Sequence, residues 1–71
     1  MKAVLPKDLQ LGKKYSDIPF MNGQEIIMEF VKYNKEAIYL KHVSGNERYI
    51  ETDGLIEFPY NGTAFYEIEN Q

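Results

Sequence analysis

The chain has 71 residues, a net charge of −3 and no cysteine, and 44% of its residues are hydrophobic. A chain of this length forms one domain with one small core, because folding at this size hides only about 60% of the surface of the unfolded chain. The composition excludes disulfides and thiolate metal sites, and small cores without such links are often stabilised by association. We therefore expect a single domain over residues 1–71 that forms a homo-oligomer.

Charge is divided unevenly along the chain. Residues 1–46 carry a net charge of +2, whereas residues 47–71 carry −5. Proteins that bind nucleic acid present a basic face to the phosphates, so the acidic C-terminal part argues against that class. The one basic group in which a phosphate would sit consists of Lys2, Lys7, Lys13 and Lys14. The alternative interpretation is that these lysines are solvated side chains of the N-terminal segment.

The N-terminal segment, residues 1–22, contains neither a long apolar run nor a small-residue cleavage site, and no window approaches the ~20 apolar residues of a membrane span. We therefore expect a soluble cytoplasmic protein without membrane contact. Pro6 is tolerated at the start of a helix and Gly12 at its end, which allows one helical turn over Lys7–Leu11. Otherwise the segment is expected to be irregular.

From residue 23 onward, turn residues alternate with short apolar runs. The turns are Asn22-Gly23, Asn34-Lys35-Glu36, Ser44-Gly45-Asn46, Asp53-Gly54 and Asn61-Gly62. Asn-Gly and Asp-Gly are strong hairpin signals, because both central residues of such turns need a positive φ. Five strands are predicted between them: Gln24–Tyr33, Ala37–Val43, Arg48–Thr52, Leu55–Phe58 and Thr63–Glu69. This spacing predicts an all-β fold, a small five-stranded antiparallel barrel built from a meander over residues 23–71.

The register of the first hairpin follows from its side chains. A three-residue loop over residues 34–36 places four pairs opposite one another: Phe30–Leu40 and Met28–His42 on one face, Val31–Tyr39 and Glu29–Lys41 on the other. A shift by one residue would mix apolar and charged partners, which cross-strand pairs avoid. The predicted core is then Ile26, Met28, Phe30, Ile38, Leu40, Ile50, Tyr66 and Ile68.

The other face of this sheet is also unusually apolar. We expect it to carry Ile27, Val31, Tyr33, Tyr39, Val43, Tyr49 and Phe65. A solvated sheet face is normally polar. Three explanations remain open: a bent first strand that serves the core with both faces, an N-terminal segment folded over the second face, or an interaction surface for a like chain or another protein.

Few residues in the chain are suited to catalysis. His42 is the only histidine, and no cysteine accompanies it, so a sheet position beside Met28 is expected in place of a zinc site or a catalytic triad. The acids Glu51, Asp53 and Glu57 surround a turn and are expected to be solvated. We therefore predict no catalytic residue, no metal site, no cofactor and no enzymatic activity.

The stretch "IPFMNGQEIIMEFVKYNKEAIYLKHVSGNERYIETDGLIEF" resembles the layout of small SH3-like and Sm-like β-barrels. Asn22-Gly23 precedes the first long strand, and "TDGLIEF" lies where Sm-like chains have a glycine followed by an apolar strand. The resemblance implies a barrel able to assemble edge to edge. Sm-like proteins place a basic residue before that glycine, where this chain has Asp53, which argues against RNA binding. The chain also resembles small accessory proteins of bacteriophages, many of which bind a host factor.

The sequence is consistent with two functions. The first is an interaction module, a small regulator or inhibitor that occupies a host or self protein partner through Ile27, Val31, Tyr33, Tyr39, Tyr49 and Phe65. The alternative is an oligomeric barrel that binds a nucleotide or oligonucleotide, with a tyrosine stacked on the base. The phosphate would then be held by Lys13, Lys14 or Arg48.

Overall fold

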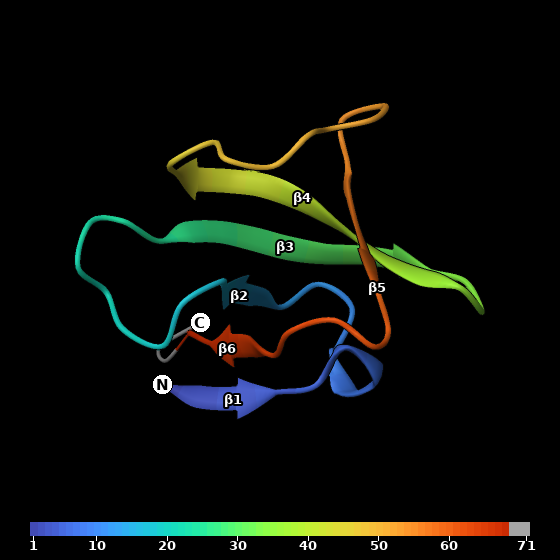
Figure 1. The fold of residues 1–71 in the computed structure, drawn as a ribbon, viewed down its shortest axis with the longest axis horizontal. Coiled ribbons are helices and arrows are strands. Elements are labelled where there is room, and N and C mark those ends of the chain that lie inside the picture. Colours follow the sequence, from blue (N-terminus) through green and yellow to red (C-terminus); the bar gives the residue numbers. More distant parts are fainter. Residues whose placement is uncertain (69–71) are drawn as a thin grey trace.

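A computed structural model of the chain describes residues 1–68. Within them, six antiparallel strands form one sheet: β1 (Lys2–Val4), β2 (Lys14–Ser16), β3 (Ile26–Tyr33), β4 (Ala37–Gly45), β5 (Ile56–Pro59) and β6 (Phe65–Glu67). The strand order is β1-β6-β2-β3-β4-β5, so β1 and β5 are the two edges. The sheet curls into a half-barrel, with β5 crossing the β3–β4 hairpin in the view of Figure 1. The predicted all-β antiparallel architecture is confirmed, although the barrel is not closed.

The N-terminal segment is more regular than predicted. It contributes two strands, and β2 joins β6 on one side and β3 on the other. Its helical turn is a 3-10 turn, η1, at Pro6–Asp8, which begins at the proline because the fixed φ of proline suits a helix start. The two strands are only three residues long, too short for an alternating pattern to show in the sequence. Since these strands extend the sheet sideways, the segment is not a cover over its second face.

The long β3–β4 hairpin matches the predicted register in its middle and departs from it near the turn. The three confirmed pairs are Met28–His42, Glu29–Lys41 and Phe30–Leu40. A bulge at Val31 then shifts the register, so that Tyr39 lies opposite Lys32 and Tyr33 lies opposite Ile38. The expected Val31–Tyr39 pair is wrong, because one extra residue in β3 exchanges the faces of everything beyond it. The Lys32 ammonium lies 5.1 Å from the Tyr39 ring centroid, a favourable contact for the observed pair.

The predicted strand Arg48–Thr52 is wrong. Residues 46–51 form a loop, and only an isolated bridge joins Thr52 to Leu55 around the Asp53-Gly54 turn. Both turn residues have a positive φ, as the sequence predicts for a two-residue turn. The next strand begins at Ile56, one residue later than expected. The last strand, predicted over Thr63–Glu69, is shorter in the structure and corresponds to β6. Glu69 lies outside the described residues.

The core lies on the concave side of the half-barrel. Its buried members are Leu9, Tyr15, Ile26, Met28, Phe30, Ile38, Leu40, Ile56 and Phe65. Five of the predicted core residues are confirmed: Ile26, Met28, Phe30, Ile38 and Leu40. Tyr66 and Ile68 are half-buried, whereas Ile50 is 88% exposed because its loop leaves the sheet.

Two residues expected on the open face are buried instead. Phe65 is 2% exposed, because β6 lies between β1 and β2 and turns this ring inward. There it packs edge-on against Phe58 at a centroid distance of 5.0 Å. Ile27 is also buried, next to buried Ile26 and Met28, so this part of β3 buries both of its faces. The bent-strand explanation therefore accounts for part of the apolar second face.

Candidate functional site

A pocket of about 480 Å³ lies at the turn end of the β3–β4 hairpin. Its lining comes from the N-terminal segment, the hairpin and the residue that follows β5. The lining residues are Pro6, Lys7, Leu9, Gln10, Leu11, Phe30, Tyr33, Ile38 and Tyr60, and we call this site the hairpin pocket. The volume lies in the range that takes a ligand or a few side chains of a partner, about 300–1,000 Å³.

Hydrogen bonds hold the walls of the hairpin pocket in place. The N–H of Gly12 donates to the carbonyl of Phe30 at 2.9 Å, and the N–H of Phe30 donates to the carbonyl of Lys13 at 3.0 Å. Across the pocket, the hydroxyl of Tyr60 donates to the carbonyl of Asn34 at 2.6 Å. The N-terminal segment is therefore fastened to β3, and the residue after β5 is fastened to the turn that follows β3.

The bulge in β3 places the most exposed aromatic side chain of the pocket. Because the register shifts at Val31, Tyr33 comes opposite Ile38, and both side chains line the hairpin pocket. Its ring lies 6.0 Å from that of Phe30. Tyr33 is 62% exposed and Leu11 is 58% exposed, so these two side chains form the rim. They give the mouth of the pocket an exposed and largely apolar surface.

The hairpin pocket has a single charged lining residue, Lys7. Within residues 1–68, its ammonium makes no ion pair. A neighbouring pocket of about 590 Å³ differs in this respect, since Lys2, Asp8 and Glu67 give it charges of both signs. The hairpin pocket is therefore suited to an apolar or aromatic group with a negative charge beside it.

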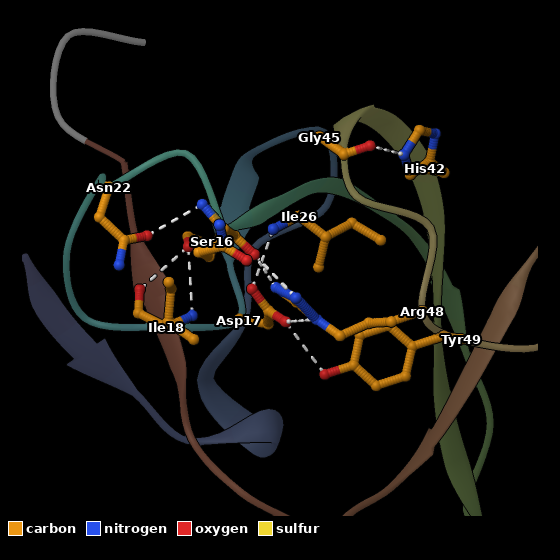
Figure 2. A network of polar contacts seen from close by, with 10 residues as sticks. Ser16, Asp17, Ile18, Asn22, Ile26, His42, Gly45, Arg48 and Tyr49 are labelled. Atoms are coloured by element: carbon orange, nitrogen blue, oxygen red, sulfur yellow. Dashed lines mark hydrogen bonds and ion pairs between the residues drawn. The ribbon is translucent and has the colours of Figure 1, made fainter.

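A polar site separate from the hairpin pocket lies just after the C-terminal end of β2, around Asp17 (Figure 2). The Asp17 carboxylate accepts hydrogen bonds from the Arg48 Nε at 3.0 Å, the Tyr49 hydroxyl at 3.1 Å and the Ile26 N–H at 3.0 Å. The Arg48 guanidinium also donates to the carbonyl of Gln24, from Nη1 at 2.7 Å and from Nη2. We call this arrangement the Asp17 clamp. It fixes the loop after β4 to the loop before β3.

Two groups near the Asp17 clamp have shifted pKa values. The N–H groups of Glu25 itself, Gly23 and Asn22 hydrogen-bond the Glu25 carboxylate, and with the nearby Arg48 charge they lower the pKa of this carboxyl. Partial burial, followed by the charge and hydrogen bond of Asp17, raises the pKa of the Tyr49 hydroxyl. Both shifts favour the protonation states present at neutral pH, a carboxylate and a neutral phenol.

The six predicted contact residues do not form one surface. Tyr33 lines the hairpin pocket, while Val31 and Tyr39 are half-buried. Tyr49 belongs to the Asp17 clamp and packs edge-on against Phe58 at 5.1 Å. The remaining two, Ile27 and Phe65, are buried. A role in partner binding stays a prediction for the four accessible residues, and Tyr33 is the one that lies in a pocket.

The predicted phosphate contacts are likewise separated. The Lys13 ammonium lies 3.5 Å from the Glu67 carboxylate at one end of β2, while Arg48 bonds Asp17 at the other end. Lys14 lies in β2 opposite Glu29. A shared phosphate would have to displace these carboxylates, so this role also stays a prediction.

The remaining polar residues have structural surroundings. His42 lies opposite Met28, as predicted, with its Nε2 3.2 Å from the Gly45 carbonyl oxygen. Among residues 1–68, no three His, Cys, Asp or Glu side chains group as a metal site would require. The described part of the chain also has no helix with the length and apolar character to span a membrane.

Sequence reasoning missed most of the hairpin pocket. The segment Pro6–Leu11 has apolar residues only at positions 6, 9 and 11, and a 3-10 turn gives no recognisable period over so few residues. Tyr60 was recognisable as an aromatic directly before the Asn61-Gly62 turn, although nothing in the sequence places it beside Asn34. A comparison of the chain with protein-family models, curated proteins and solved structures gave no match. Function is therefore inferred from the residues themselves.

Proposed function

We propose that the protein is a small, non-enzymatic interaction module that binds a partner protein through the hairpin pocket and acts as a regulator or inhibitor by occupancy. The observation that carries this proposal is the pocket itself, which is rimmed by the exposed side chains of Leu11 and Tyr33. Exposed apolar and aromatic surface of this kind is typical of protein interfaces. A cytoplasmic host factor, as bound by bacteriophage accessory proteins, is the kind of partner we propose.

Binding would work by inserting one large apolar side chain of the partner. Phe30 and Ile38 form the buried floor, and Tyr33 would close over the inserted group from the rim. Because the Tyr60–Asn34 hydrogen bond already fixes one wall, little conformational freedom is lost on binding. The partner is then blocked sterically, and no chemical step is needed.

The test is a selection of peptides from a random library with the full chain as bait. We expect the enriched peptides to share an aromatic or aliphatic anchor. The Leu11→Ser and Tyr33→Ser variants should each bind these peptides about tenfold or more weakly, since anchor pockets contribute most of the affinity at such interfaces. Val43→Ser is the matched control, because Val43 is also exposed but does not line the pocket.

Two results would count against this function. Peptides that bind both rim variants as tightly as the parent chain would remove the hairpin pocket from the proposal. Nucleotide binding that weakens steeply with salt, and that is lost in Arg48→Ala and Lys14→Ala, would instead support the phosphate-binding alternative.

A further inference from the structure

We propose that the hairpin pocket also receives a second copy of this chain, which inserts Ile50 and places Glu51 beside Lys7. This self-association goes beyond the proposed function, since it needs no foreign partner. The side chain of Ile50 is 88% exposed, the highest value among the exposed large apolar residues of the described chain. Ile50 does not line the hairpin pocket of its own molecule, so its side chain is available to the pocket of a second copy.

The loop that carries Ile50 is held at both ends. On its N-terminal side, Arg48 and Tyr49 are bound by the Asp17 clamp, and the Tyr49 ring rests on Phe58. On its C-terminal side, the backbone of Thr52 exchanges two hydrogen bonds with Leu55 around the turn, at 2.8 and 3.1 Å. A fixed loop loses little entropy on docking, so an isoleucine displayed in this way is suited to insertion.

Charge favours this loop over another exposed apolar segment, residues 20–21. Phe20 and Met21 are each more than half exposed, but the sequence around them, Pro19 and Asn22, carries no charge. Ile50 is followed directly by the exposed carboxylate of Glu51. The hairpin pocket offers an apolar lining and one ammonium, that of Lys7, without an ion pair in residues 1–68. An apolar side chain next to an acid is therefore its complement.

The contact would be heterologous, since each molecule offers its loop to one neighbour and its pocket to another. Contacts of this type form rings when the rotation closes and open chains when it does not. In either form the hairpin pocket is filled by the neighbour's loop. Self-association would therefore compete with any other partner for the same site.

The first test is sedimentation velocity of the full chain from about 10 μM to about 1 mM, the range in which small interfaces dissociate. We expect the mass of the parent chain to rise with concentration and the Ile50→Ser variant to stay monomeric. Phe20→Ser is the matched control and should associate like the parent chain. Far-UV circular dichroism verifies the fold, and both changes lie at exposed positions.

A charge exchange tests the orientation of the contact. Lys7→Glu and Glu51→Lys should each weaken association about tenfold or more, because like charges then meet at the pocket. An equimolar mixture of these two variants should associate again, since one contact is then the natural pair and the next is the reversed pair. Only a contact between position 7 of one copy and position 51 of another gives this recovery.

Three outcomes would overturn the inference: a parent chain that stays monomeric over the whole range, an Ile50→Ser variant that associates normally, or a mixture that does not recover. None of them affects the proposed function. Ile50 lies outside the hairpin pocket, so the monomeric variant should still bind the selected peptides. If peptide binding is lost while self-association stays intact, the result counts against the proposed function and leaves this inference standing.

Discussion

Asp17 shows how one side chain can join distant parts of a small chain. Its side chain is 7% exposed and its carboxylate accepts hydrogen bonds from Arg48, Tyr49 and the Ile26 N–H. We expect Asp17→Asn to lower the free energy of unfolding by about 1–3 kcal/mol, because the amide cannot accept from all three donors. Urea unfolding monitored by circular dichroism measures this. The exposed control Glu57→Gln should stay within about 0.5 kcal/mol, and equal losses in both variants would contradict the role of the clamp.

Glu25 makes the free energy of unfolding depend on pH in the acidic range. The backbone N–H groups that bind its carboxylate lower its pKa in the folded state relative to the unfolded state. The stabilising contribution is therefore complete above the unfolded pKa and is lost as the pH falls through the folded pKa. We expect Glu25→Gln to flatten this acid part of the stability profile, measured by urea unfolding from pH 7 downward. A Glu25→Gln profile that falls as steeply as that of the parent chain would contradict this assignment.

At the scale of elements, Gly45 limits how the β3–β4 hairpin ends. Its φ is +90°, and a Cβ at this position would overlap the carbonyl oxygen of Glu25. We expect Gly45→Ala to cost at least about 2 kcal/mol, because steric overlap adds to the backbone strain. Gly54 also has a positive φ but faces open space, so Gly54→Ala should cost only about 1 kcal/mol. Thermal unfolding compares the two, and equal losses would mean that the overlap is relieved at no cost.

Which elements were predictable depends on their length and their partners. The β3–β4 hairpin is long and its side chains alternate, so its turn and three of its pairs follow from the sequence. The bulge at Val31 was not predictable, since it places Tyr39 opposite Lys32 against the usual pairing preference. The strands Lys2–Val4 and Lys14–Ser16 are set by their neighbours in the sheet, which the sequence does not identify.

The candidate site was predictable to a smaller extent than the fold. Tyr33 was expected as a contact, but on the face of Tyr39, and the bulge carries it to the other side of the sheet. Phe65 was wrongly assigned to the open face. Its strand has two partners, β1 and β2, which the sequence did not reveal. The exposed position of Ile50 follows from the Asp17 clamp, which joins residues far apart in the chain and leaves no local signal.

For the whole molecule, the edge strand β1 protects the C-terminal part of the sheet. It covers β6 through the pairs Lys2–Glu67, Ala3–Tyr66 and Val4–Phe65. We expect deletion of residues 2–4 to lower the Tm by about 10 °C. At about 4–8 °C per kcal/mol for a small domain, this corresponds to a loss of about 1–2.5 kcal/mol in the free energy of unfolding. The uncovered strand should also promote aggregation, measured by light scattering. The control Lys2→Ser keeps the strand, and a deletion variant as stable as this control would show that β6 needs no cover.

The strand order also determines when the molecule can fold during its synthesis. Among the strands of residues 1–68, β1 comes earliest in the chain and pairs with β6, which comes last. While the chain emerges from the ribosome, the β3–β4 hairpin can form from neighbouring residues, but the first strand must wait for Phe65–Glu67. Non-local pairings of this kind form slowly, because a long loop must close first. The sheet is therefore completed only after Phe65–Glu67 have been made, and until then Val4 has no partner strand.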